Sequence, residues 1–214
     1  MKTHIYSGQT FGPEKYKQIG AALQKGCIAA FPTDTVYGLG AVYSNEEAVR
    51  KIFKAKGRDE GKPLSVLISS MDQVDLLAAG VPSEAHILME KFWPGPLTLI
   101  LKKKEGIPDE VTAGGETVGI RMPANEIALN IIKAAGSPLA APSANISGKR
   151  SAVCIEDVLE DLDGKIDIAV DGGPAQIGVS STILEVSEMR IIRQGSITPE
   201  MIGDALRESK NFPK

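Results

Sequence analysis

The sequence predicts an α/β fold in one domain over residues 1–214. Short apolar runs typical of strands alternate with amphipathic helical patterns from end to end. No low-complexity tract, long linker or internal repeat divides the chain. With 214 residues, 43% of them hydrophobic, the chain is long enough for one well-buried core and short for a second full domain.

The bulk properties restrict the class of function. A net charge of −3 and a pI near 5.5 argue against a surface that binds nucleic acid all over, so any positive field must be local. Cys27 and Cys154 lie far apart without a CxxC partner, which excludes a four-cysteine zinc site, favours a reducing compartment and predicts two buried small hydrophobes. Residues 1–12 lack the apolar core of a signal peptide, and no run approaches about 18 apolar residues. We therefore expect a soluble, cytoplasmic protein with no membrane contact.

The helices and strands are expected from start and stop signals along the chain. Pro13 can open a helix that ends at Gly26, before a strand at 27–31. Asn45 caps a second helix, which has carboxylates in its first turn and ends at Gly57. Further strands are expected at 64–68, 97–101, 117–121, 139–141, 166–170, 182–186 and 190–193, and further helices at 70–79, 83–92, 125–135, 155–162 and 199–209.

A polar segment follows the strand at 27–31 and is typical of a small-molecule site. Pro32 ends the strand by removing a donor, and we expect Gly38 and Gly40 to let the backbone turn and approach a ligand. The Thr-Asp-Thr sequence at 33–35 offers donors and acceptors without bulk. An ordinary strand-to-helix turn is the alternative, because Thr, Asp and Gly also favour turns for local reasons.

A basic segment closes the second helix. Lys56 falls four residues after Ile52 on the apolar face, which is unusual for a lysine that does not reach into a cleft. Between Arg50 and Lys62 the basic residues outnumber the acidic ones six to two, and phosphate is their natural target. For Arg50, Lys51 and Lys54, a solvated helix face is a sufficient explanation. Lys56, Arg58 and Lys62 remain candidates for phosphate binding.

Polar side chains also occur at the ends of later predicted strands. Ser143 and Asn145 follow a proline stop, and Arg121 ends another strand, where its fork suits a carboxylate or a structural ion pair. The segment 180–182 and Arg193 are assigned to two more predicted strand ends. Ligands of open α/β sheets bind beyond the carboxyl ends of strands, so these residues are expected to share one cleft with the 33–37 segment.

The sequence lacks several common catalytic signatures. Of its two histidines, His86 falls on a predicted helix, and no Walker loop or GxGxxG motif occurs. A Ser-His-Asp hydrolase or a histidine-ligated metal enzyme is therefore disfavoured. The residue types present favour catalysis by positioning and by electrostatic stabilisation of phosphate and carboxylate groups, without a covalent nucleophile.

Six segments together resemble one enzyme family. They are PTDTVYGL at 32–39, KGR at 56–58, KPL at 62–64, WPGPLT at 93–98, GIRMP at 119–123 and SANISG at 143–148. In this order they resemble the YrdC-type threonylcarbamoyl-AMP synthases in their short form, over about 12–197, followed by a C-terminal helix at 199–209. The resemblance implies a twisted, mostly open sheet with flanking helices around a deep positive cavity. It also implies a nucleotidyltransferase that converts L-threonine, bicarbonate and ATP into threonylcarbamoyl-AMP and pyrophosphate, toward N6-threonylcarbamoyladenosine in tRNA.

The resemblance assigns roles to matching positions. The family's paired motifs place Lys56, Arg58, Ser143 and Asn145 at the catalytic nucleotide site, with Lys62, Thr117, Ser151 and Arg193 completing the ATP side and Thr35, Arg121 and Ser181 holding threonine. Position 67, a histidine in some relatives, is Leu67 here, so one threonine contact is expected to be absent. Mg2+ is expected with the triphosphate, without a dedicated set of protein ligands.

Two alternatives stay open from the sequence. A YciO-like or carbamoyl-adenylate-forming paralogue would use the same fold on another substrate, and an RNA-binding module would use the cavity without turnover. The acidic net charge and the aromatic content of 5% weigh against an RNA-stacking surface. A possible tRNA contact and downstream threonylcarbamoyl-transfer proteins are the expected partners.

Overall fold

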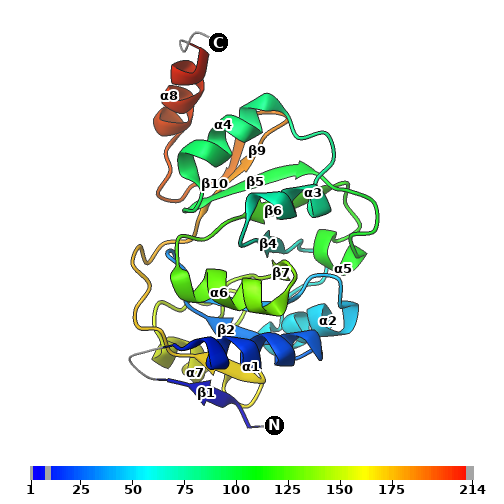
Figure 1. Ribbon diagram of the computed structural model, residues 1–214, viewed down its shortest axis with the longest axis vertical. Helices are drawn as coiled ribbons and strands as arrows, with labels where there is room; N and C mark the ends of the chain where they lie inside the picture. The colour runs from blue at the N-terminus through cyan, green and yellow to red at the C-terminus, as the bar shows by residue number, and fades with distance from the viewer. Residues whose placement is uncertain (1, 8–10, 211–214) are drawn as a thin grey trace.

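A single ten-stranded sheet organises the protein (Figure 1). The computed structural model describes residues 2–7 and 11–210. Within them the strands lie in the order β1-β8-β2-β3-β7-β4-β6-β5-β9-β10. Their bounds are β1 His4–Tyr6, β2 Ala29–Phe31, β3 Gly38–Val42, β4 Ser65–Leu67, β5 Leu97–Lys102, β6 Thr117–Arg121, β7 Leu139–Ala140, β8 Ile168–Val170, β9 Thr182–Glu185 and β10 Arg190–Arg193. Parallel pairs join β1 to β8, β8 to β2, β4 to β6 and β5 to β9, and the other neighbours are antiparallel.

Helices cover both faces of this mixed sheet. They are α1 Pro13–Gln24, α2 Glu46–Lys56, the 3-10 turn η1 Met71–Gln73, α3 Val74–Leu77, α4 Ser83–Phe92, α5 Asp109–Thr112, α6 Glu126–Ala135, α7 Ile155–Leu162 and α8 Pro199–Lys210. The buried faces of α1 and α6 form one core cluster, and those of α2, α4 and α7 belong to another. The expected open, twisted α/β sheet with flanking helices is confirmed. No described helix is long and apolar enough to span a membrane.

The helix signals that the sequence offered are used as expected. Asn45 Oδ1 accepts a hydrogen bond from Ala48 N at 3.0 Å at the start of α2. Gly57 ends this helix in the left-handed conformation, at φ 57°, which glycine adopts without the penalty that a Cβ would bring. The chain therefore changes direction at Gly57, and Arg58 follows directly after the last turn of α2.

Some local expectations are wrong. The expected helix over 70–79 is only η1 followed by the single turn of α3, because Ala78 turns to extended backbone and forms a β-bridge with Lys103. Cys27 and Cys154 are half-buried and not buried, since both lie in connections outside the helices and strands.

The two glycines of the 33–40 segment do not form the turn that their type suggested. Gly38 and Gly40 lie in β3, which pairs antiparallel with β2. A Cβ on Gly40 would lie 2.7 Å from the Phe31 ring. Gly40 is thus required by packing against the neighbouring strand, whereas Gly38 lies beside the cavity described below.

We expect Gly20→Ala to destabilise the protein. A Cβ at Gly20 of α1 would lie 2.3 Å from the carbonyl oxygen of Ala134 in α6, so the two helices would have to separate, at a cost of about 1–3 kcal/mol. Urea unfolding measures the change. Gly203→Ala in α8 is the control, because a Cβ there would meet only the flexible end of the Arg207 side chain, at 3.4 Å, and it should not destabilise the protein by more than about 0.5 kcal/mol. A Gly20→Ala value in that same range would contradict the prediction.

Candidate active site

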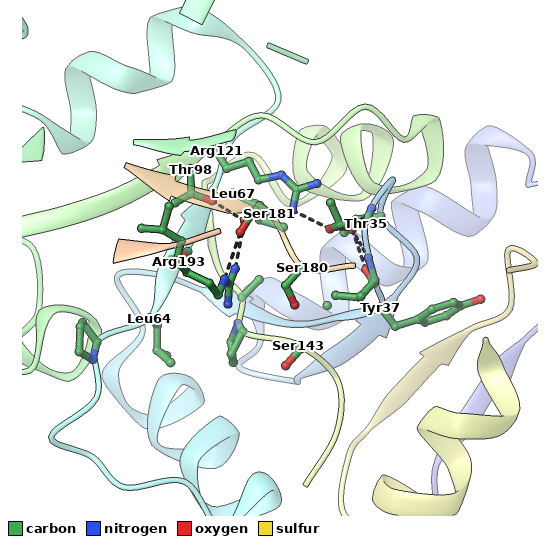
Figure 2. A pocket seen from close by; sticks show the side chains of 18 of the residues that line it. Thr35, Tyr37, Leu64, Leu67, Thr98, Arg121, Ser143, Ser180, Ser181 and Arg193 are labelled. Carbon is green, nitrogen blue, oxygen red and sulfur yellow. Dashed lines mark hydrogen bonds between the residues drawn. The ribbon is translucent and has the colours of Figure 1, made fainter. Parts of the chain in front are cut away.

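A cavity of about 150 Å³ lies on the face of the sheet (Figure 2). Its floor is a row of side chains from neighbouring strands. Leu67 pairs with Arg121, Thr98 pairs with Ile183 and Ile183 pairs with Arg193, and continuing the β5–β6 register by one residue sets Thr98 opposite Arg121. Residues opposite each other across a ladder point to the same face. The register of five strands therefore brings Arg121 and Arg193 into one cavity, their backbones about 14 Å apart at the usual strand spacing.

Arg121 is buried and held by three protein groups. Its Nη2 pairs with Asp34 Oδ1, its Nη1 donates to Thr35 Oγ1 at 2.8 Å and its Nε donates to Gly95 O at 2.9 Å. Burial lowers the pKa of Arg121, and the Asp34 carboxylate opposes this shift. A guanidinium has five N–H donors, so two are left for a ligand. The expected carboxylate fork and the structural ion pair are compatible alternatives here.

The Thr-Asp-Thr segment is fixed by its own hydroxyl groups. Thr33 Oγ1 accepts from the Thr35 and Val36 amides at 3.2 and 3.3 Å and donates to Val36 O at 2.6 Å. It also lies 3.0 Å from Thr35 Oγ1. This compact turn presents Thr35 to the cavity and Asp34 to Arg121.

Arg193 is attached to the segment before β9. Its Nε donates to Ser181 O at 3.0 Å and its Nη2 donates to Ser181 Oγ at 3.2 Å, while Ser181 Oγ lies 2.8 Å from Thr98 Oγ1. Figure 2 shows these three contacts as one chain across the cavity. Ser180 and Ser181 precede β9, which begins at Thr182, so the segment lies at the start of a strand and not at the end of one, where it was expected. They reach the cavity from the amino end of that strand.

The cavity concentrates positive charge. Arg58, Arg121 and Arg193 are among its lining residues, which include no carboxylate. Arg193 is exposed at the end of β10, but partial desolvation lowers its pKa, and the nearby Arg58 lowers it further. Asp34 is paired with Arg121. Arg58 and Arg193 therefore lie near each other in a cavity that no carboxylate lines. An anion between them would relieve this repulsion.

Lys56 and Asn145 lie behind the cavity and not on its lining. Lys56 Nζ donates to Ser143 O, and to Asn145 O at 2.6 Å. Asn145 Nδ2 donates to Ile146 O and Lys149 O at 2.8 and 3.0 Å, and its Oδ1 has no partner among the described residues. Arg58 and Ser143, their partners in the two motifs, do line the cavity.

Three expected ATP-side residues lie outside this lining. Lys62 is exposed, and Thr117 is exposed at the start of β6, at the opposite end of that strand from Arg121. Ser151 lines a different small cavity, which it shares with charged residues of the 149–161 region such as Arg150 and Asp157. Their assignment to ATP stays a prediction.

The sequence reasoning missed two polar lining residues, Ser65 and Thr98. Thr98 is 1% exposed in an otherwise apolar strand, and a polar residue at an inward position of such a strand was the available signal. Leu67, at the position where a contact was expected to be lost, is part of the floor and contributes an apolar wall beside Arg121. No cluster of three or more His, Cys, Asp or Glu able to hold a metal occurs among residues 2–7 and 11–210.

The sequence is similar to one family model and to several known proteins. The family model described as telomere recombination, which covers Sua5, YciO and YrdC proteins, matches residues 21–195. The threonylcarbamoyl-AMP synthase of Pyrococcus abyssi is 47% identical over 89% of this chain and 57% of its own length. A putative threonylcarbamoyl-AMP synthase of Methanocaldococcus jannaschii is 37% identical over 92% of this chain and 95% of its own length.

A solved structure agrees with both relatives. The crystal structure of Pyrococcus abyssi Sua5 complexed with L-threonine matches with a TM-score of 0.92 and 44% identity, over 95% of this chain and 61% of the other. The chain thus spans little more than half the length of the Pyrococcus proteins that it matches. Because the family model covers most of the sequence, a relative is 37% identical over nearly its whole length and a solved member shares the fold, the chain belongs to the Sua5/YciO/YrdC family.

Proposed function

We propose that this protein is an L-threonylcarbamoyladenylate synthase, a nucleotidyltransferase that uses L-threonine, bicarbonate and ATP. The observation that carries the proposal is one cavity in which Arg121 and Arg193 are separated along the floor by Thr98 and Ile183, and which no carboxylate lines. Such a site suits a substrate pair with a carboxylate at one end and phosphates at the other. The names of the relatives, and the threonine complex of the Pyrococcus abyssi structure, support this choice.

The proposed reaction joins two anions. The threonine amine attacks the carbon of bicarbonate, and the carbamate forms with loss of water. A carbamate oxygen then attacks the α-phosphorus of ATP, the bond to the β-phosphate oxygen breaks, and pyrophosphate leaves. The protein holds the reactants together and screens their repulsion. In this scheme Arg121, Thr35 and Ser181 hold threonine, and Arg58, Arg193 and Ser143 hold the nucleotide.

The metal and the partners belong to the same proposal. Mg2+ would enter with the triphosphate, whose oxygens would supply ligands together with water. Lys62, Thr117 and Ser151 complete the ATP side only if the bound nucleotide extends beyond the cavity. The product would be passed to threonylcarbamoyl-transfer proteins acting on tRNA in the cytoplasm, with a direct tRNA contact as a further possibility.

The reaction is tested with purified protein, Mg2+, ATP, L-threonine and labelled bicarbonate. We expect the label in a product that also contains threonine and AMP, with pyrophosphate as co-product, because the adenylate forms by attack on the α-phosphorus. Omission of threonine should abolish pyrophosphate release. ADP formation, or equal pyrophosphate release without threonine, would refute the proposal and favour a carbamoyl-adenylate-forming paralogue. Nucleotide binding without turnover would favour a binding module.

Arg121→Lys should weaken the use of threonine by about tenfold or more and leave ATP binding nearly unchanged. A lysine keeps the charge but cannot reproduce the planar two-donor geometry toward a carboxylate. Steady-state kinetics with each substrate varied separately would measure both effects. Thermal unfolding is the control, since the variant also loses contacts to Thr35 and Gly95. Loss of ATP affinity with unchanged threonine use would reverse the assignment.

Arg193→Gln should weaken ATP binding about tenfold or more, because a charge-assisted bond contributes about 1.5–3 kcal/mol. Arg190→Gln is the matched control on the same strand. Arg190 is exposed and pairs with Glu185, away from the cavity. Calorimetry with ATP and Mg2+ compares the two. Equal affinities for the two variants would remove Arg193 from the nucleotide side.

A further inference from the structure

We propose that Lys56 is a positioning residue, which ties the 143–147 loop to the end of α2 so that Ser143 faces the cavity, and that it does not itself bind the nucleotide. The proposal rests on the proposed function only for the identity of the ligand. It departs from the expectation that Lys56 contacts phosphate directly.

The location of Lys56 carries the first step. Its side chain is 1% exposed, and it is not among the residues that line the cavity. Two of its three N–H donors are directed at backbone oxygens, those of Ser143 and Asn145. A buried ammonium that lost these acceptors would pay a large desolvation penalty. The ammonium is therefore committed to the loop.

The loop depends on α2 and β3 for its shape. Ser147 N donates to Lys56 O at 2.8 Å, so both the main chain and the side chain of Lys56 hold this loop. Ala144 N donates to Tyr37 O at 2.8 Å, and Ser143 forms a β-bridge with Gly38. Between these attachments Ser143 lines the cavity (Figure 2).

In each of the motifs at 56–58 and 143–145, the two polar residues differ in their position relative to the cavity. Arg58 follows Lys56 across Gly57 and lines the cavity, and Ser143 precedes Asn145 and lines it too. The inner members, Lys56 and Asn145, contact each other through the bond from Nζ to the Asn145 carbonyl. Each motif thus has one residue at the cavity and one behind it, and the two behind join the motifs together.

The charges around Lys56 make the contact sensitive to pH. Arg58 lies two residues on, Asp161 of α7 faces the loop, and Lys149 pairs with Asp161 at 2.6 Å. Burial, followed by the Arg58 charge, lowers the pKa of Lys56 to about 8, against the opposing effect of Asp161. As the pH rises through about 8, the ammonium loses its proton, and charge-assisted bonds become ordinary ones of roughly half the strength. The loop should then be held less firmly.

Hydrogen exchange tests the anchoring without any ligand. In Lys56→Met, amides of the 143–149 segment should exchange about tenfold faster than in the wild type, while those of β5 remain protected. Lys54→Met is the matched control, because Lys54 is exposed on the same last turn of α2, and should leave the segment unchanged. Unchanged exchange in Lys56→Met would overturn the proposal.

The wild-type protein provides a second measurement if Lys56→Met fails to fold. Between pH 7 and pH 9.5, exchange of the 143–149 segment should rise several-fold more than the intrinsic base-catalysed increase, and the β5 amides should follow that intrinsic increase alone. A segment that follows the intrinsic rate throughout would overturn the proposal as well.

A double-mutant cycle distinguishes positioning from direct phosphate contact. If Lys56 acts through Ser143, Lys56→Met should weaken ATP binding about tenfold in the wild type but less than about threefold in a Ser143→Ala background. Losses that multiply fully would assign Lys56 to the nucleotide and overturn the proposal. If the wild type binds no ATP, the proposed function fails, and the exchange experiments still decide the role of Lys56.

Discussion

Burial of the Arg121 guanidinium is the constraint on which the site depends. At 5% exposure the charge is removed from water, which is tolerated only when a partner and further hydrogen bonds replace the solvent. Asp34, Thr35 and Gly95 supply them from segments far apart in the sequence. Removing one partner of such a buried pair costs about 3–5 kcal/mol. The same contacts that satisfy Arg121 therefore lock the turn after β2 and the entry to β5 around the cavity.

The remaining cations are less completely satisfied. Arg58 Nε is buried without a partner among the described residues, and Arg193 bonds only to groups of Ser181 that carry no charge. Partial desolvation lowers the pKa of both arginines. Arg193 is exposed to solvent and Arg58 is half-buried, and no carboxylate lines the cavity beside them, so an anion that binds there would gain from both charges. This differs from Arg121, whose charge is balanced by Asp34 before any ligand arrives.

Rigid elements support the residues on the floor, and connections support those on the walls. Leu67, Arg121, Thr98, Ile183 and Arg193 project from paired strands, whose register fixes their spacing. Ser143 and Ser181 belong to connections, and each is held by a basic side chain from elsewhere, Lys56 in one case and Arg193 in the other. Both lysine and arginine are thus used here as donors to backbone oxygens as well as sources of charge.

The sequence by itself determined the α/β class and most helices and strands. Of the site residues that it predicts, six line the cavity, namely Thr35, Arg58, Arg121, Ser143, Ser181 and Arg193, and five do not, namely Lys56, Lys62, Thr117, Asn145 and Ser151. These depend on local signals such as the Asn45 cap, the left-handed Gly57 and polar residues at strand ends. Only the tertiary structure decided that Gly40 makes room for Phe31, that Thr98 joins the floor, and that Lys56 turns to the loop. Each of these depends on which residues become neighbours across the sheet, and strand order and register are contacts between distant segments that no local pattern encodes.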